Sequence, residues 1–372
     1  MEPAKVYFAD FRTTLTENLQ QKLWRLLDKA SMGTIDFDKK YAAIKLHFGE
    51  PGNLAFLRPN WAKTVADYVK AHGGKPFLTD CNTLYVGGRK NALDHMDSAY
   101  LNGFSPFSTG CHVIIADGLK GTDETYVPVE GGEYIKEAKI GTAIMDADVL
   151  ISLTHFKGHE NTGFGGALKN IGMGCGSRAG KMEMHNAGKP RVHQKRCVGC
   201  AMCTRVCAHG AITVQDRKAS IDHTKCVGCG RCIGMCPHDA IACDYDESNI
   251  VLNRKIAEYT KAVVDGRPCF HIALVIDVSP NCDCHAENDV PIVPNVGMFA
   301  SFDPVALDQA CADAVNQMPA NPHSALFDHD APKAEDAHDH FHAAHPETNW
   351  QSALEHGEKI GIGTRQYTLI RI

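Results

Sequence analysis

Short apolar runs alternate with segments of helical periodicity through the first half of the chain. The apolar runs are rich in β-branched and aliphatic residues and predict strands at 5–10, 42–48, 75–80, 112–117 and 148–153. Between the second and third runs, Trp61, Val65 and Tyr68 recur at helical spacing, and Gly73 follows as a stop signal. Similar patterns predict helices at 17–30, 90–101 and 134–145. Strands that alternate with helices predict an α/β fold class, with a mainly parallel sheet covered by helices on both faces.

A segment of different character interrupts this alternation. Residues 191–245 hold two cysteine-rich runs, each followed by a short strand-like tail, and we expect them to form an inserted α+β module of the ferredoxin type. The α/β pattern then resumes with a helix at 250–265 and a strand at 272–278. We therefore expect one α/β domain, built from residues 1–190 and 246–372, with a two-cluster module set into it.

The two cysteine-rich runs read CVGCAMCTRVC at 197–207 and CVGCGRCIGMC at 226–236. Each has the spacing C-x2-C-x2-C-x3-C of bacterial ferredoxins, in which three cysteines of one run and the fourth of the other hold each [4Fe–4S] cluster. By this rule the first cluster is held by Cys197, Cys200, Cys203 and Cys236. The second cluster is held by Cys226, Cys229, Cys232 and Cys207. The sequence therefore predicts two [4Fe–4S] clusters, and such pairs relay single electrons.

Zinc and disulfides are the alternatives for these cysteines. Eight thiolates satisfy two zinc ions, but a zinc knuckle needs neither the third cysteine of each run nor the fourth. Disulfide frameworks belong to short secreted chains, and eight of the 16 cysteines lie in runs too tightly spaced for one. Ala208 stands where the second run has Pro237, which affects the turn after Cys207 more than the ligand itself. A purely structural role is the alternative to electron transfer.

A glycine-rich stretch follows the strand predicted at 148–153 and reads THFKGHENTGFGGALKN. A turn of this kind that leads from a strand into a helix can bind an anionic ligand. We expect such a ligand or cofactor to contact Gly163, Gly165, Gly166 and Lys169. The candidate catalytic residues, whose side chains donate or carry protons, are His155, His159 and Lys169, with Lys157 as a further donor. A tight turn with solvated polar side chains is the structural alternative.

Other polar residues stand at or near predicted strand ends, namely Lys45, His47, Asp80 and Asp117. Ligands of open α/β sheets bind at the carboxyl ends of the strands, so these residues are candidates for the same crevice. Taken singly, each has an ordinary structural explanation.

A second cysteine pattern, NCDCH, follows the strand predicted at 272–278. Cys282 and Cys284 are one residue apart, so both thiolates can reach one metal ion, with Cys175 and either His185 or His285 as further ligands. An additional metal or anionic ligand is therefore a candidate cofactor, and a pair of reduced thiols in a loop is the alternative. Cysteines without such spacing are interpreted as small buried hydrophobic residues: Cys81, Cys111, Cys243, Cys269 and Cys311.

Composition limits the classes of function. A content of 44% hydrophobic and 22% charged residues is typical of globular proteins, and a net charge of −6 gives no basic surface for nucleic acid. The first ten residues show no signal peptide and no apolar run reaches the length of a membrane span, so a cytoplasmic protein is expected. Six histidines in 321–346 show no repeating ligand spacing and are interpreted as part of a solvated connection rather than a metal store.

Several stretches together resemble one bacterial and archaeal family, catalogued as domain of unknown function 362: TDCNT, DADVLISLTHFKGHENTGFGGALKNIGMGC, NCDCH and VGMFASFDPVALDQA. The resemblance covers nearly the whole chain. It implies an α/β domain with an iron–sulfur module and supplies no reaction. The stretch GFGGALK at 163–169 is also similar to the glycine-rich stretch of nickel-pincer lactate racemases, in which a lysine at the position of Lys169 holds the cofactor, although Ala167 departs from that stretch.

The main functional hypothesis is a redox protein whose two clusters exchange electrons with a ligand or metal site in the α/β domain. Its partner is then a redox protein or a small-molecule substrate, and it can be an oxidoreductase. One alternative is a non-enzymatic electron carrier whose α/β domain docks a partner enzyme. Another is a metal- or cofactor-handling protein that uses the cysteines outside the two runs.

Overall fold

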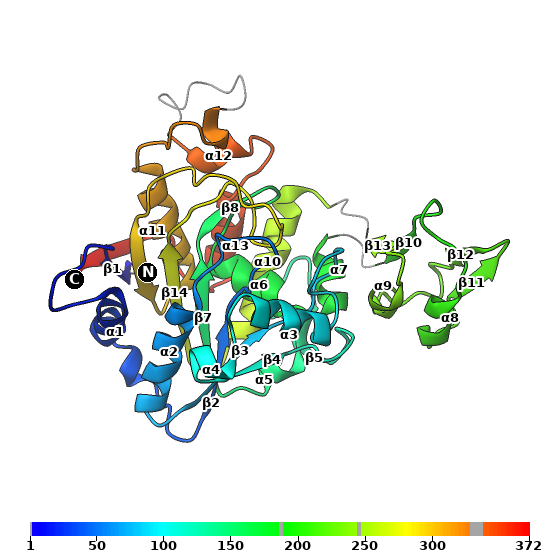
Figure 1. Ribbon diagram of the computed structural model, residues 1–372, viewed down its shortest axis with the longest axis horizontal. Coiled ribbons are helices and arrows are strands. Elements are labelled where there is room, and N and C mark those ends of the chain that lie inside the picture. Colours follow the sequence, from blue (N-terminus) through cyan, green and yellow to red (C-terminus); the bar gives the residue numbers. More distant parts are fainter. Residues whose placement is uncertain (1, 186–188, 244–246, 328–337) are drawn as a thin grey trace.

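The computed structural model describes residues 2–185, 189–243, 247–327 and 338–372. One eight-stranded sheet crosses the larger part of the molecule (Figure 1). In spatial order its strands are β16 (Tyr367–Arg371), β1 (Ala4–Ala9), β15 (Gly297–Ser301), β14 (Cys269–Val275), β7 (Val149–His155), β2 (Tyr41–Lys45), β3 (Lys75–Asp80) and β4 (His112–Ile115). The strands from β14 to β4 run parallel to one another, whereas β15 is antiparallel to both of its neighbours.

Helices cover both faces of this sheet. One face carries α1 (Leu19–Lys29), α2 (Pro59–Ala71) and α3 (Ala92–Leu101). The opposite face carries α6 (Ala167–Cys175), α10 (Asn249–Val264) and α11 (Pro304–Asn316). Shorter helices complete the layers: α4 (Pro106–Thr109), α5 (Thr142–Met145), α7 (Arg178–His185), α12 (His340–Ala344), α13 (Gln351–Lys359) and two single 3₁₀ turns at Met32–Thr34 and Ala325–Phe327. The predicted α/β class, with a mainly parallel sheet, is confirmed.

Side-chain alternation along β2 shows why the sheet is buried on both faces. Ala42 and Ile44 pack with α1 and α2, whereas Ala43 between them packs with α6 and α10. Successive strand residues point to opposite faces, so a strand covered on both sides is continuously apolar. This is the pattern from which the strands were predicted, and the prediction at 75–80 coincides with β3.

The helix predicted at 134–145 is wrong. The middle of that segment forms β6 (Glu137–Gly141), which pairs in an antiparallel hairpin with β5 (Glu124–Pro128), and a helical turn starts at Thr142. Ala138 and Ile140 are buried while Glu137 and Lys139 turn outward, which is a period of two. The strand is too short for that period to stand out from its neighbours in the sequence.

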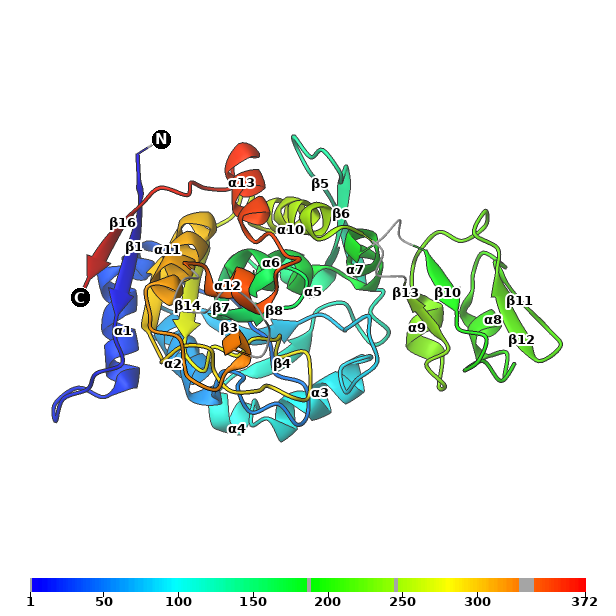
Figure 2. The same cartoon turned by 90° about the horizontal axis from the view of Figure 1, so that it is seen from above.

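The cysteine-rich segment forms a small lobe at one end of the molecule, beyond α7 (Figures 1 and 2). It contains two antiparallel pairs and two helices, namely β10 (Pro190–Val192) with β13 (Ile241–Cys243), β11 (Ile212–Gln215) with β12 (Lys218–Ile221), α8 (Met202–Val206) and α9 (Arg231–Met235). The halves are related by sequence: Ala201 and Gly230, which hold equivalent places in the two runs, precede α8 and α9 in the left-handed conformation with φ of 59° and 64°.

Arg178 joins the lobe to the larger part of the molecule. Its side chain is fully buried, and its guanidinium donates to the carbonyl oxygens of Lys90 and Lys120, the latter at 3.1 Å from Nε. A Cβ on Gly230 would lie 2.8 Å from Cγ of Arg178, and one on Gly234 would lie 3.1 Å from Cζ. Side chains at these two positions would obstruct the arginine, so glycine permits the close approach.

This contact explains a difference between the two runs. At the places equivalent to Gly230 and Gly234, the first run has Ala201 and Arg205. The glycines are found in the run that packs on Arg178, and the larger residues in the other run. A partly buried ion pair between Lys90 and Asp239 supports the same junction.

Replacing Arg178 should weaken this junction. We expect Arg178→Met to lower the free energy of unfolding by about 2–4 kcal/mol, because two carbonyl oxygens lose a charged donor and remain buried. Urea unfolding under anaerobic conditions measures the change, with Arg12→Met as the control because Arg12 is exposed. Equal midpoints for the two variants would contradict the assigned role of Arg178.

Candidate functional site

A cavity of about 590 Å³ lies at the carboxyl ends of the parallel strands, within the range of volumes found for ligand sites. Lys45 ends β2, Asp80 ends β3 and His155 ends β7, and all three line this cavity. His47, two residues beyond Lys45, lines it as well. The parallel strands bring these residues together, because strands that run in one direction end at one edge of the sheet.

A short hairpin and a helix form another wall of the cavity. The hairpin pairs β8 (Lys157–His159) with β9 (Gly163–Gly165), and α6 follows directly. Lys157, His159, Gly165, Gly166 and Lys169 all line the cavity. A Cβ on Gly165 would lie 2.8 Å from Nζ of Lys157, so glycine leaves room for this lysine to extend beneath the hairpin.

The start of α6 already has a hydrogen-bond acceptor within the chain. The carboxylate of Asp308 accepts hydrogen bonds from the backbone N–H groups of Ala167, at 2.6 Å, and Leu168, at 2.9 Å. Any side chain at Gly166 would collide with this carboxylate. The glycine-rich turn therefore accommodates Asp308 and does not offer these two N–H groups to a ligand, which differs from the anion site expected from the sequence.

Lys157 and Lys169, two of the cations that line the cavity, have no acidic ion-pair partner among the described residues. Lys45 lies 3.0 Å from Asp80, and Arg89 lies 2.8 Å from Glu50, so these charges are balanced. Lys157 and Lys169 form no such ion pair within the described ranges. Burial opposes the charge on Lys157, but Cys282 and Asp283 nearby more than compensate and raise its pKa. The cavity therefore presents to an anionic ligand two ammonium groups that form no ion pair among the described residues.

His155 holds a loop in place. Its Nδ1 lies 2.8 Å from the carboxylate of Asp283, and its Nε2 lies 2.7 Å from the carbonyl oxygen of Ile276. Burial alone would raise the pKa of Asp283, but His155 and Lys157 lower it to about 2. Since both ring nitrogens are engaged, His155 positions the segment between Cys282 and Cys284 rather than carrying protons to a ligand.

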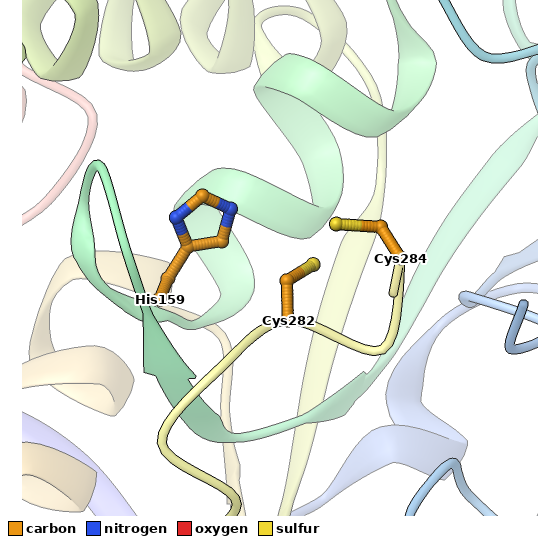
Figure 3. A group of neighbouring side chains, drawn as sticks. All are labelled: His159, Cys282 and Cys284. Carbon is orange, nitrogen blue, oxygen red and sulfur yellow. The ribbon is translucent and has the colours of Figure 1, made fainter. Parts of the chain in front are cut away.

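His159, Cys282 and Cys284 come together against the cavity (Figure 3). One ligand atom from each of them lies within 4.8 Å of the other two. A hydrogen bond between the two thiols raises the pKa of Cys282 to about 11 and lowers the pKa of Cys284. Nζ of Lys169 lies 3.9 Å from Sγ of Cys282. The neighbouring Glu160 and His285 form a second possible ligand group that shares Cys284.

Cys175 and Asp117 lie elsewhere. Cys175 is the fully buried last residue of α6, where its carbonyl oxygen accepts a hydrogen bond from the Cys81 thiol, and it is not among the described residues that line the cavity. Asp117 accepts hydrogen bonds from the backbone and side-chain nitrogens of Asn82 and faces a different hollow, next to Cys207. His185 does line the main cavity.

The eight cysteines of the two runs line two small cavities of about 20 Å³ each. One cavity is lined by Cys197, Cys200, Cys203 and Cys236. The other is lined by Cys207, Cys226, Cys229 and Cys232. Three of the sulfur atoms accept hydrogen bonds from backbone N–H groups: Cys197 from Ala219, Cys207 from Ala211 and Cys236 from Ala240.

Helix α7 is a wall common to the main cavity and the cysteine lobe. Lys181 and His185 line the main cavity, whereas Met182, on the same helix, packs in an apolar cluster with Cys197, Cys203 and Cys232. Leu84 belongs to both, since it lines the cavity and packs in that cluster. Side chains of α7 and Leu84 thus lie between the two sites.

Several lining residues were not anticipated from the sequence. Arg89, Tyr85 and Glu50 form a buried hydrogen-bonded group at one side of the cavity. They lie in irregular segments with no motif. Glu160 is adjacent to the candidate residue His159 in the sequence, and this adjacency is the signal that could have identified it as a lining residue. Burial would raise the pKa of Glu160, but His159 and His285 hold it below its usual range.

The histidine-rich segment provides no cluster within its described part. His340 bonds the carbonyl oxygen of Met318 and His345 bonds that of Pro280. Residues 328–337, which include His329, lie outside the described residues. Within the described ranges, none of the helices has the length and apolar character needed to cross a membrane.

Comparison with known proteins gives one family and a few distant relatives. The family described as Domain of unknown function (DUF362) matches residues 42–313. A thylakoid-associated protein of Synechocystis sp. is 28% identical over 131 residues, which are 34% of this chain and 35% of that protein. The chain thus spans about a third of this curated relative.

Two solved structures also match. The lactate racemase apoprotein from Thermoanaerobacterium thermosaccharolyticum is 11% identical with a TM-score of 0.35, over 74% of this chain and 51% of that one. A structural-genomics protein from Thermotoga maritima is 12% identical with a TM-score of 0.42, over 82% of this chain and 59% of that one.

The Asp308 cap should make stability depend on pH. Burial raises the pKa of Asp308 to about 7 from an ordinary 3.8, so the folded protein retains a proton that the unfolded chain releases. The resulting stabilisation is complete at acidic pH and is lost as pH rises through the folded pKa. Between about pH 5 and about pH 8, we expect the wild type to lose about 1–3 kcal/mol of unfolding free energy relative to Asp308→Asn. Urea unfolding at both pH values measures this difference, and a difference that stays constant would contradict the assignment.

Proposed function

The chain belongs to the DUF362 family, and we propose that it is an iron–sulfur redox protein that carries two [4Fe–4S] clusters and passes electrons between its cysteine lobe and a ligand in the α/β cavity. The observation that carries this proposal is the common wall: α7 and Leu84 line the main cavity and also pack in the apolar cluster that contains Cys197, Cys203 and Cys232. Electron exchange between two sites requires that they be close. Side chains of α7 and Leu84, which belong to both sites, support that requirement.

The donor sets fit the clusters. Each of the two small cavities is lined by four cysteines, three from one run and one from the other, which is the arrangement that a cubane of this kind needs. Nη1 of Arg178 is buried and has no acceptor among the described residues, although it lies against the second run. A cluster sulfur in the second set would supply the missing acceptor. Clusters held there supply one-electron transfer.

The two cysteine sets differ in their surroundings, and this difference suggests a direction of electron transfer. Cys200 of the first set is exposed, while the second set lies under Arg178 at the junction with α7. A buried cation favours the more negative, reduced form of a neighbouring centre and so raises its potential. We therefore infer that electrons enter at the first set and leave from the second toward the cavity. Val198 and Val227, exposed at equivalent places of the two runs, offer an apolar contact to a redox partner protein.

The cavity suits a small anionic ligand. Lys157 and Lys169 supply charge and form no ion pair with a carboxylate among the described residues, and Lys169 projects from the first turn of α6 beside the two cysteines. The hairpin and α6 thus present donors to the ligand, while His155 and Asp308 hold the surrounding segments in place. We propose an oxidoreductase role for this cavity, with a small-molecule substrate.

The cluster assignment predicts a specific iron content. Anaerobically purified protein should contain about eight iron and about eight sulfide per chain, because two cubanes each hold four of both. Cys232→Ser should lose about four of each, because it removes a ligand of the second set. Cys243→Ser is the matched control, since Cys243 is buried in the same lobe and lines neither small cavity. Iron near zero in the wild type, with zinc in its place, would exclude the clusters.

The direction of transfer predicts a selective change of potential. Arg178→Met should lower the reduction potential of one cluster by about 60 mV, which corresponds to about 1.4 kcal/mol for one electron, and leave the other unchanged. Arg178→Lys retains the charge and should shift the same potential less. Redox titration followed by EPR separates the two clusters. If both potentials were unaffected by loss of the charge, the inferred exit through the second set would be wrong.

A further inference from the structure

The group of His159, Cys282 and Cys284 has the composition of a metal site. Their ligand atoms lie within 4.8 Å of one another, and the side chains point toward a common space in Figure 3. They come from two elements: His159 ends β8, and both cysteines lie in the loop after β14. His159 and Cys282 are buried and Cys284 is half-buried, yet all three line the cavity. A cation bound among them would therefore be reachable from the cavity and shielded from bulk solvent.

We propose that His159, Cys282 and Cys284 bind one soft or borderline divalent cation, of the zinc, nickel or iron class, with an open coordination position toward the cavity. Thiolate and imidazole ligands select these metals over magnesium and calcium. Three protein ligands and one open position are typical of catalytic rather than structural sites, which close with four protein ligands. This inference names the place where the electrons of the proposed function arrive, and to that extent it rests on that function.

The cysteine loop is held in place without a metal. Asp283, between the two cysteines, pairs with His155 through its side chain, and its carbonyl oxygen accepts a hydrogen bond from the backbone of Glu50 at 2.9 Å. The carbonyl oxygen of His285 accepts another from the side chain of Asn53 at 3.0 Å. Contacts of this kind orient the ligands of a metal site and reduce the cost of ordering them on binding. The geometry of the two thiols is thus fixed by residues that do not touch the metal.

His159 is expected to be the weakest of the three ligands. Its Nδ1 accepts hydrogen bonds from the backbone N–H groups of Asn161, at 3.0 Å, and Thr162, at 3.3 Å, so Nε2 carries the proton of the neutral ring. Nε2 is the nitrogen on the side of the sulfur atoms in Figure 3. Coordination there requires this proton to leave Nε2, either by disrupting the backbone hydrogen bonds or by ionising the ring. The two cysteines therefore supply most of the affinity.

Charge identifies the class of the fourth ligand. Two thiolates neutralise a divalent cation, and Lys157 and Lys169 then leave the region positive. An anion with an oxygen or sulfur donor can complete the coordination and contact a lysine at the same time. We therefore expect a small carboxylate or thiolate at the open position. Oε1 of Glu160 is already hydrogen-bonded to His285 at 3.1 Å, whereas its Oε2 is buried with no hydrogen-bond partner among the described residues.

The test is a metal titration of the full chain. Anaerobic protein is treated with a chelator that leaves the clusters in place, then equilibrated with zinc, and zinc and iron are counted separately by mass spectrometry. We expect about one zinc per chain. Cys282→Ser and Cys284→Ser should each weaken zinc binding by about 10-fold or more, and His159→Gln should weaken it less. Cys269→Ser is the matched control, because Cys269 does not line the cavity.

The outcomes separate this inference from the proposed function. Zinc bound equally by all variants, or no zinc bound by the wild type, would overturn the metal site whatever the iron content. A disulfide between Cys282 and Cys284 in the anaerobic protein would overturn it too. Low iron with normal zinc would instead overturn the cluster proposal. Retained iron in the serine variants shows that they are folded.

Discussion

The buried guanidinium of Arg178 is the contact on which the arrangement of this protein depends. It is bonded to two carbonyl oxygens of the α/β part and packed against two glycines of the second cysteine run. Because Arg178 begins α7, the same helix that docks the lobe also extends along the cavity and contributes Lys181 to it. The positions of the two sites are therefore coupled. Without this contact, the cysteine lobe would lose its buried anchor on the α/β part.

Inside the cavity, two residues maintain the shape of the site, and one of them, His155, looks catalytic in the sequence. His155 uses both ring nitrogens to hold the loop between the two cysteines, and Asp308 fills the start of α6. Each is buried and hydrogen-bonded. A neighbouring side chain faces the cavity in each case, Cys284 beside the loop that His155 holds and Lys169 beside the helix start that Asp308 caps. The chemistry of the site then depends on two lysines and on the group of His159 with Cys282 and Cys284.

The parts that could be predicted from sequence are those set by local spacing. The apolar runs at β2, β3 and β7 alternate across a sheet that is buried on both faces, and cysteines in a fixed repeat converge because the chain between them is short. Contacts between distant segments could not be predicted in this way. Nothing near Ala167 indicates that Asp308 caps its helix, and nothing near Cys282 indicates that His159, rather than Cys175, is its neighbour. The sequence does not reveal the hairpin of β5 and β6, because two buried side chains, Ala138 and Ile140, in a five-residue strand do not establish a period.

The central claim is that one lobe holds two clusters close together and joined to the cavity, and the EPR spectrum of the anaerobic, fully reduced protein tests it most directly. Two reduced clusters in a lobe of this size lie close enough to broaden and split each other's signals. We expect such an interaction spectrum for the wild type, and a simple, unsplit spectrum when Cys232→Ser removes a ligand of the second set. An unsplit spectrum from a single cluster in the wild type, or no cluster signal, would contradict the account.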